Sequence, residues 1–303
     1  MLDLKLSWLG LSSNSCAALG FVFPRMAALF QLNLSGNSID EYCVESLIHG
    51  LVQCNRLQLL NLNNNTIGDN GLDMLIQGLP ASVNTLKLDD NQVALARQLP
   101  LTRFESLHLS FNSLCHGGPG IIAESLANPS CRLRELYLCD ANIRDEGMTT
   151  LAGSLRGNRG LTCMALSNND ITDGWNAFTS VLCDSTSIDA TRDSNHTLYY
   201  MGSCSRNWDI PSDVREILQF NYGRDKSRVA ALKILETNRH LDMRPFLDKK
   251  LGLLPHVVAW LDLFAESRLD LKLSSIFEFV RAMPMDVVCG AARSKQREIP
   301  VPA

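Results

Sequence analysis

The stretch LFQLNLSGNSI, residues 29–39, returns in outline as LQLLNLNNNTI at residues 57–67. Both follow the pattern L-x-x-L-x-L-x-x-N-x-I. Four further copies begin at Val83, Phe104, Leu133 and Leu161, and degenerate copies flank the six at residues 4–11 and 188–198. A phrase that recurs in this way is typical of a repeat architecture. Leucine accordingly makes up 49 of the 303 residues.

The repeated phrase contains a short strand, and the residues between copies have the period of a helix. In L-x-L the apolar residues alternate with period two, so one face of the strand is buried. Between the strands, apolar residues recur at helical spacing, as in residues 44–51. Asp69 and Asp145 stand where two helices should begin, and we expect them to act as N-caps. Stacked units of this kind predict an α/β solenoid with a parallel concave sheet and convex helices.

The asparagine of the phrase has a structural explanation. After the last strand leucine the chain turns sharply, and a buried carboxamide can both accept from and donate to the backbone groups of the turn. The sequence therefore predicts an internal ladder formed by Asn37, Asn65, Asn91, Asn112 and Asn169. In the fifth copy Ala141 stands where asparagine belongs.

The repeats resemble those of leucine-rich-repeat proteins of the ribonuclease-inhibitor type. Between the third leucines of successive copies, from Leu6 to Leu166, the intervals are 28, 28, 26, 21, 29 and 28 residues. Repeats of about this length with a full convex helix are what the resemblance implies for residues 1–200, as a horseshoe of about eight turns. The 21-residue interval departs from it, because residues 92–101 are too short for a full helix, and we expect a thinner convex layer there.

Composition and charge exclude several classes of protein. A net charge of −4 argues against a strongly basic nucleic-acid binder. No stretch approaches the roughly 18 apolar residues of a membrane span, and the first twenty residues do not resemble a secretory signal. The ten cysteines lack short paired spacings. We therefore expect a cytoplasmic protein with reduced cysteines, with the nucleus left open as a location.

Beyond residue 200 the leucine phrase gives way to helical patterning. We expect a helical C-terminal cap over residues 201–287, which would cover the open end of the solenoid, and a disordered tail over residues 288–303. The segments SNHTL at 194–198, LPHVVAW at 254–260 and IFEFVRAMP at 276–284 also look similar to the ends of stand-alone leucine-rich-repeat proteins predicted from algal genomes.

Patterns typical of catalysis are missing from the sequence. The glycine run Gly117, Gly118 and Gly120 lacks the lysine and hydroxyl of a phosphate-binding loop, and we interpret it as a turn. The six histidines show no metal-ligand spacing, and no serine elbow or cysteine nucleophile signature occurs. The sequence therefore predicts a non-enzyme without cofactor or metal and without a small-molecule substrate.

A binding surface is expected on the concave face, where the residues between the strand leucines point away from the core. Aromatic side chains surrounded by polar ones are typical of interface hot spots. The candidate partner-binding residues are Lys87, Asp89, Asp90, His108, Phe111, Tyr137 and Asp140.

The sequence thus predicts a non-catalytic protein-interaction scaffold that binds a protein partner, without expected nucleic-acid or membrane contacts. Three alternatives remain open. The resemblance implies an activator of a Ran-type small GTPase, although the acidic segment that follows the repeats of such activators has no counterpart here. It also implies a ribonuclease-inhibitor-like blocker of an enzyme. The third alternative is a fragment of a larger repeat-containing sensor.

Overall fold

The structure is a computed structural model and describes residues 1–202 and 210–237. These residues form parts of two compact units. Unit 1 comprises Met1–Leu182 and Asn195–Tyr222, and unit 2 comprises Cys183–Ser194 and the chain from Gly223 onward. Most of the expected cap, the tail, and the segments 254–260 and 276–284 lie outside the described residues. The boundary at residue 200 therefore stays a prediction.

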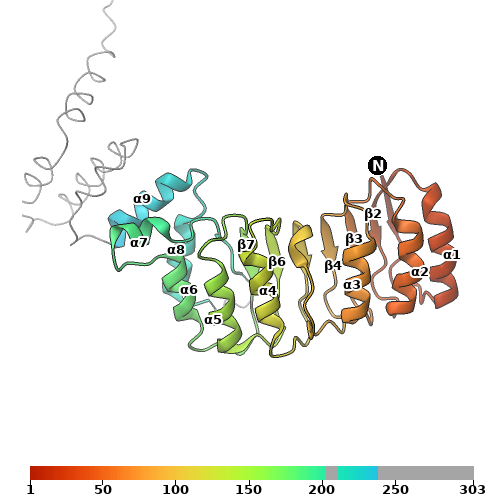
Figure 1. Ribbon diagram of the computed structural model, residues 1–303, viewed down its shortest axis with the longest axis horizontal. Coiled ribbons are helices and arrows are strands. Elements are labelled where there is room, and N and C mark those ends of the chain that lie inside the picture. Colours follow the sequence, from red (N-terminus) through yellow and green to blue (C-terminus); the bar gives the residue numbers. More distant parts are fainter. Residues whose placement is uncertain (203–209, 238–303) are drawn as a thin grey trace, which may run out of the picture. The chain divides into compact units, whose positions relative to one another are not determined.

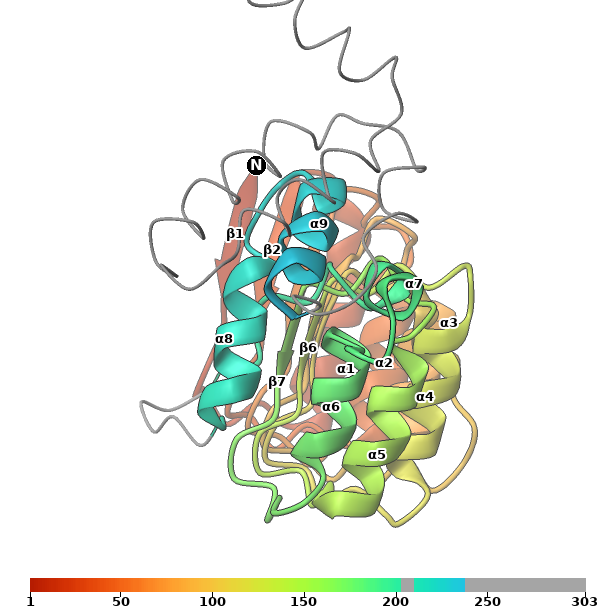
Figure 2. The same ribbon diagram turned by 90° about the vertical axis from the view of Figure 1, so that its left-hand side faces the viewer.

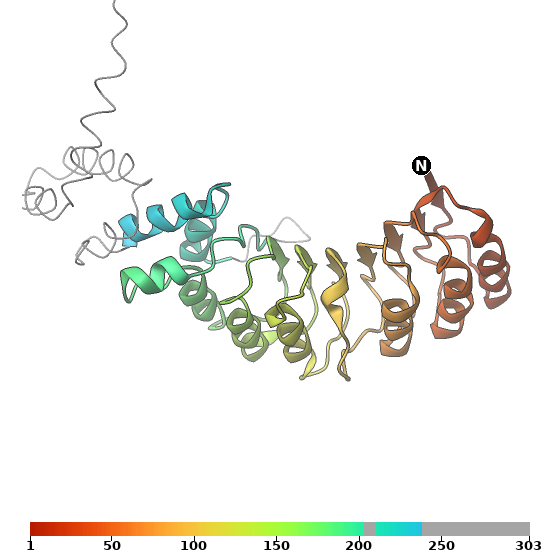
Figure 3. The same ribbon diagram turned by 45° about the horizontal axis from the view of Figure 1, so that its top comes forward.

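Parallel strands form the inner layer of unit 1 (Figure 3). In the described chain they are β1 Leu2–Lys5, β2 Leu29–Asn33, β3 Leu59–Asn61, β4 Thr85–Lys87, β5 Ser106–His108, β6 Glu135–Tyr137 and β7 Cys163–Ala165. They follow one another in chain order across a single sheet, which confirms the predicted parallel sheet. The register aligns equivalent leucines, with Leu60 beside Leu86 and Leu107 beside Leu136.

The convex layer consists of helices on one side of the sheet, one after each strand from β1 to β3 and from β5 to β7 (Figures 1 and 2). These helices are α1 Ser13–Val22, α2 Glu41–Leu51, α3 Asp69–Gly78, α4 Gly118–Ala127, α5 Arg144–Ser154 and α6 Trp175–Leu182. Sequence-adjacent helices pack against each other from α1 to α3 and again from α4 to α6. This alternation of strand and helix confirms the leucine-rich-repeat solenoid.

The short repeat has no convex helix, as its length predicted. Between β4 and β5 the described chain holds only a 3-10 turn, Leu101–Arg103. Arg103 occupies part of this region, and its guanidinium donates to the carbonyls of Ile76 at 2.6 Å, Leu79 at 3.1 Å and Pro80 at 2.8 Å. These carbonyls lie at and just after the C-terminal end of α3, so one side chain stabilises the end of a helix in the preceding repeat.

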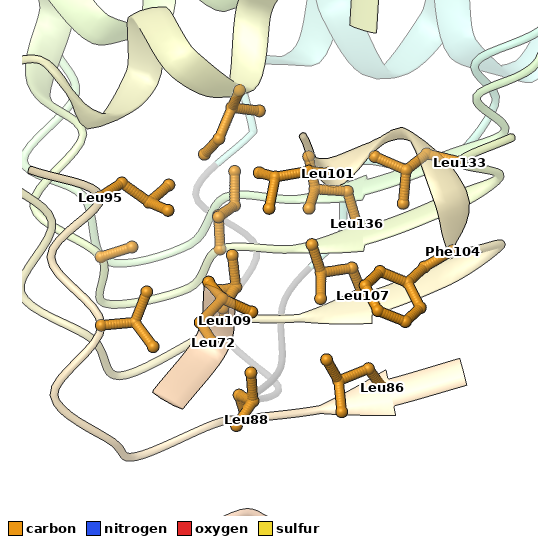
Figure 4. Close-up of a cluster of buried hydrophobic side chains, with 14 of the residues drawn as sticks. Leu72, Leu86, Leu88, Leu95, Leu101, Phe104, Leu107, Leu109, Leu133 and Leu136 are labelled. Atoms are coloured by element: carbon orange, nitrogen blue, oxygen red, sulfur yellow. The ribbon is translucent and has the colours of Figure 1, made fainter. Parts of the chain in front are cut away.

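The hydrophobic core lies between the sheet and the helices. The central leucines of the strands, among them Leu86, Leu107 and Leu136, are completely buried, and Figure 4 shows them with Leu101 and Phe104 from the short repeat. At the C-terminal end of unit 1, helix α8 Ser212–Phe220 adds Val214 and Leu218 to the same core. The core is therefore continuous through the repeat that lacks a helix.

The asparagine ladder is confirmed. Asn65 shows its geometry: its carbonyl oxygen accepts from the N–H groups of Asn37 at 3.0 Å and Ile39 at 2.8 Å, and its amide nitrogen donates to the carbonyls of Leu62 and Leu34. Each asparagine thus bonds the turn of its own repeat and that of the preceding one. The five ladder residues, Asn37, Asn65, Asn91, Asn112 and Asn169, all make bonds of this kind.

The N-cap prediction for Asp69 and Asp145 is wrong. The N-caps of α3 and α5 are Gly68 and Ile143, and neither cap makes a side-chain hydrogen bond to its helix. Instead, both carboxylates accept from backbone N–H groups of the following repeat. Asp69 accepts from Ala94, Leu95 and Ala96, and Asp145 from Thr172 and Gly174.

Two further local expectations are corrected. The glycine run does not form an isolated turn, because Gly118 and Gly120 lie in the first turn of α4. Residues 188–198 do not hold the next strand: helix α7 occupies Ile188–Asp193, and Tyr200 pairs in parallel with Cys163 at the edge of the sheet. In unit 2, α7 packs against α9, Lys226–Thr237.

Among the described helices, none combines the length and the apolar character that a membrane span requires.

Candidate functional site

The register of the sheet brings the predicted strand residues together. Lys87 lies beside His108, and His108 beside Tyr137, on the adjacent strands β4, β5 and β6. Because these positions alternate with the buried leucines, their side chains lie on the face of the sheet opposite the core. The three predicted strand residues thus form one row, which continues through Asn61 on β3.

His108 is the centre of this row and is held from several sides. Its ring stacks on the ring of Tyr137, with centroids 4.1 Å apart and an interplanar angle of 18°. Its Nδ1 lies 3.5 Å from the Asp89 carboxylate, and its Nε2 lies 3.3 Å from the Ser106 hydroxyl oxygen. The ring is therefore fixed in position before any partner arrives.

Sequence reasoning missed Ser106 and Glu135, which extend this polar chain. The Ser106 hydroxyl donates to the Glu135 carboxylate at 3.0 Å. Each stands two residues before a predicted site residue on its own strand, Ser106 before His108 and Glu135 before Tyr137. Period two places such residues on one face, so the spacing could have identified both.

The order Ser106, His108 and Asp89 has the residue types of a hydrolytic triad but not its hydrogen bonding. In a triad the serine hydroxyl donates its hydrogen to the histidine, which acts as the general base. Here the hydroxyl donates to Glu135, and Ser106 is 7% exposed. The arrangement positions the imidazole ring rather than activating the serine.

Asp89 is fixed by the loops that follow β3 and β5. Its carboxylate accepts from the backbone N–H of Ser110 at 2.8 Å and from the side-chain amide of Asn63 at 3.1 Å. Its own N–H donates to the Asn63 carbonyl oxygen at 2.9 Å. Asp89 is therefore a preorganised negative charge beside His108.

The three remaining predicted residues occupy one repeat position, two residues after the last strand leucine. Asp90, Phe111 and Asp140 have φ angles of 54°, 57° and 50°, in the left-handed region. This conformation turns the chain away from the sheet in each repeat. The same position holds Trp8, Gly36, Asn64 and Asn168, all with positive φ.

Phe111 is the unusual member of this set among the central repeats. Asparagine, aspartate and glycine tolerate the left-handed region, whereas a bulky aromatic residue is strained there. The side chain is nonetheless half exposed, at 50%. In the next repeat, Asp140 accepts from the Asn168 amide at 3.0 Å.

Burial favours the neutral forms of Tyr137 on β6 and Cys163 on β7. It raises the pKa of the Tyr137 hydroxyl above its ordinary value, and the nearby Cys163 and Glu135 raise that pKa further. Cys163, on the neighbouring strand β7, has its pKa raised to about 12 by burial. At neutral pH the pair therefore contributes an aromatic surface and no thiolate.

No cluster of three or more potential metal-ligating side chains occurs within the part of the chain that the structure describes.

Sequence comparisons place the repeats among known proteins. No family model matches the chain. The ribonuclease inhibitor of Mus musculus is 27% identical over 209 residues, which are 56% of this chain and 46% of that protein. The NACHT, LRR and PYD domains-containing protein 4E of Mus musculus is 31% identical over 150 residues, 46% of this chain and 15% of that protein. The chain thus spans less than half the length of these relatives.

Among solved structures, an internalin of Listeria monocytogenes aligns with a TM-score of 0.36 and 20% identity, covering 57% of this chain and 56% of the internalin. The sequence relationship and the observed repeats lead to the same conclusion. The chain is a leucine-rich-repeat protein, related in sequence to ribonuclease inhibitors and to the repeat regions of NACHT, LRR and PYD domains-containing proteins.

Proposed function

We propose that this protein is a non-catalytic scaffold that binds a protein partner through the exposed face of its sheet. The contact region is the concave patch, formed by Lys87, Asp89, Asp90, His108, Phe111, Tyr137 and Asp140. The proposal rests on the fixed His108–Tyr137 stack beside the Asp89 carboxylate, and on the half-exposed Phe111, whose backbone is left-handed in the loop after β5.

The dimensions of the face favour a macromolecular partner. Strands are spaced by about 4.8 Å, so the row from β1 to β7 is roughly 30 Å wide. A surface of this width matches a protein or an extended peptide better than a small metabolite, which requires an enclosing pocket.

Preorganisation supports recognition through this face. His108 and Asp89 are already held by neighbouring groups, so little side-chain freedom would be lost on binding. Strain at Phe111 is typical of residues retained for a role other than stability. An aromatic residue with a polar rim is the usual composition of an interface hot spot.

The relatives suggest the first defined partner to test. Two of them are ribonuclease inhibitors, from Mus musculus and Sus scrofa. Titration of the chain into a ribonuclease assay should abolish activity at a stoichiometric ratio if this chain has the same role. Unchanged ribonuclease activity would direct the search to proteins captured from lysate.

Variants test the patch with any partner so identified. Phe111→Ala should weaken binding by about 30-fold in titration calorimetry, the loss expected for a hot-spot aromatic. Tyr42→Ala is the matched control, because Tyr42 is an exposed aromatic residue on the convex helix α2, at 69% exposure. Equal losses from both variants, or no loss from Phe111→Ala, would contradict binding through the concave patch.

A further inference from the structure

Three interior strands carry a row of hydrogen-bond donors on the exposed face of the sheet. Asn33 of β2 lies beside Asn61 of β3, and Asn61 lies beside Lys87 of β4. Each directly follows a buried leucine of its strand, so the three side chains lie on the face opposite the core. At a strand spacing of about 4.8 Å, this donor row extends roughly 10 Å from Asn33 to Lys87.

The two asparagines are held with their amide nitrogens available. The side-chain oxygen of Asn33 accepts from the backbone N–H of Ser35 at 3.0 Å, and that of Asn61 accepts from the N–H of Asn63, also at 3.0 Å. A backbone N–H can only donate, so the accepting atom must be the oxygen and the side-chain NH₂ is left over. Within residues 1–202 and 210–237, neither NH₂ group donates to another protein atom.

Lys87 continues the row with a positive charge. Its ammonium group has three N–H donors and no acceptor. Among the described residues this ammonium forms no ion pair or hydrogen bond. The carboxylate of Asp89, two residues further along, instead accepts from the Ser110 N–H and the Asn63 amide. The donor row thus offers N–H groups and one cation that no acceptor of the same chain occupies.

We propose that the donor row binds an acidic segment of the protein partner, an extended stretch rich in aspartate and glutamate. This inference rests on the proposed function, because it assumes recognition through the exposed face of the sheet. Ionised carboxylates only accept hydrogen bonds, and their bonds to N–H donors are stronger than those between neutral groups. Such a segment would meet donors along the whole row.

The charges around the row favour carboxylates over a nucleic acid. A nucleic acid carries a phosphate on every nucleotide, and proteins bind it by neutralising many phosphates with lysine and arginine. The donor row has one lysine, and Asp89 and Asp90 follow it within three residues. Its other two members are neutral amides. A few localised carboxylates therefore fit the row better than a continuous polyanion.

The neighbouring strands add an apolar requirement to the partner segment. Beyond Lys87 the same row of the sheet continues with the stacked rings of His108 and Tyr137. His108 lies two strands away from Asn61, a distance of about 10 Å that about three extended residues span. The partner segment should therefore carry an apolar side chain about three residues from its carboxylates.

Synthetic peptides test this chemistry on the full chain. The probe contains four successive glutamates, two glycines and a leucine, with a fluorophore whose anisotropy reports binding. Matched peptides carry glutamine or lysine in place of the glutamates. The glutamate peptide should bind on the order of 10-fold more tightly than either. Absent binding, equal binding of the three peptides or a preference for the lysine peptide would overturn the proposal. Equally tight binding of a deoxythymidine decamer would overturn it as well.

Aspartate substitutions test the donor row itself. In Asn61→Asp the new carboxylate can still accept from the Asn63 N–H, so the turn keeps its hydrogen bond while the outward donor is lost. Asn33→Asp makes the same change beside Ser35. Each should weaken binding of the glutamate peptide by on the order of 10-fold. Asn64→Asp is the matched control, because it adds the same charge at an exposed loop position after β3 and should change affinity little. Unchanged affinity in both row variants would contradict the proposal.

The same variants distinguish this inference from the proposed function. With an identified partner, Phe111→Ala tests binding through the concave patch, and Asn61→Asp tests the acidic segment. Loss of affinity in both variants would support both proposals. Loss in Phe111→Ala alone would leave the proposed function standing and overturn the role of the donor row. Loss in neither would overturn both.

Discussion

The position two residues after the last strand leucine serves both the fold and the candidate site. It adopts positive φ from Trp8 through Asn168 and turns the chain at the end of each strand. Most repeats use glycine, asparagine or aspartate there, which reach this conformation at low cost. Phe111 departs from that set in the concave patch, so one residue can test both the cost of the left-handed backbone and the proposed recognition.

Phe111→Asn should stabilise the protein while weakening partner binding. Asparagine already occupies the equivalent position at Asn64 and Asn168. Relief of the left-handed strain should raise the free energy of unfolding by about 1 kcal/mol, measured by urea denaturation. Partner affinity should fall as for Phe111→Ala. A variant that loses stability would show that Phe111 has a packing role that outweighs the strain.

Asn65→Ala should lower stability and leave partner binding unchanged. It removes the bonds to the N–H groups of Asn37 and Ile39 inside the protein, at a cost of about 1–3 kcal/mol. Urea denaturation measures the loss, and partner binding by the folded variant should be unchanged. Asn70→Ala, at an exposed position in α3, is the control and should change stability little. A similar cost at both sites would contradict a special role for the ladder.

Adjacent repeats are joined by carboxylates as well as by the core. Asp145 in α5 accepts from the Thr172 hydroxyl at 2.6 Å and from the N–H groups of Thr172 and Gly174 at 2.8 Å, all in the next repeat. Asp69 makes the equivalent connection from α3. A D-x-G signature at a helix start thus marks a connection between repeats in this chain.

Asp145 should make stability depend on pH in the acid range. These hydrogen bonds, that of the Thr172 hydroxyl foremost, lower the pKa of Asp145 from 3.8 to about 2. A carboxyl whose pKa is lowered by folding stabilises the protein above its unfolded pKa, and this contribution disappears as pH falls from about 4 toward 2. Asp145→Asn should therefore be less stable than the parent at pH 6, with the difference shrinking below pH 4 in denaturation experiments. A difference that is constant with pH would contradict this assignment.

The sequence predicted the strands and most helices because their signals are local. Alternation in L-x-L and helical spacing between copies depend only on nearby residues, and the 21-residue interval was enough to predict a missing helix. The wrong predictions, for the N-caps and for the glycine run, concern residues whose contacts lie far away in the sequence. The partners of Asp69 lie about 25 residues away in the sequence. Gly118 begins α4, where an added Cβ would lie 3.3 Å from the Ala94 carbonyl oxygen. The need for glycine at this position depends on a residue far away in the sequence, so a local pattern does not reveal it.

The candidate site was predictable to a similar extent. Period two and the repeat register identify the row of Lys87, His108 and Tyr137. The hydrogen bonds that fix the row, from Ser106 to Glu135 and from Ser110 to Asp89, depend on the exact alignment of neighbouring strands. The residue types on the exposed sheet face could be predicted from the sequence, whereas the hydrogen bonds that hold them could not.

The short repeat is the junction between the two runs of convex helices in unit 1. The convex helices pack in two runs, α1–α3 and α4–α6, and the chain between them is held by Arg103 and by the buried Leu95, Leu101 and Phe104. In a solenoid each repeat contacts only its neighbours, so a weakened junction affects the coupling of everything on either side.

Arg103→Ala should therefore lower the free energy of unfolding more than the loss of an exposed arginine does. It leaves the carbonyls of Ile76, Leu79 and Pro80 without their guanidinium donor and removes the cation contact 5.0 Å from the Phe104 ring. We expect a loss of about 2 kcal/mol by urea denaturation, with faster amide exchange at the end of α3. Arg97→Ala, which breaks an exposed ion pair with Asp73, should cost under about 1 kcal/mol. Equal costs would show that the junction does not depend on Arg103.

We propose that the sheet face, rather than the helix face, recognises a protein. Amide hydrogen exchange of the chain with and without its captured partner tests this most directly, because it reports on both faces in one experiment. Binding through the sheet face predicts new protection in peptides covering residues 85–90, 106–111 and 135–140, with little change in α2, α3 and α5. Protection confined to the convex helices, with the strands β4–β6 and their following loops unchanged, would contradict it.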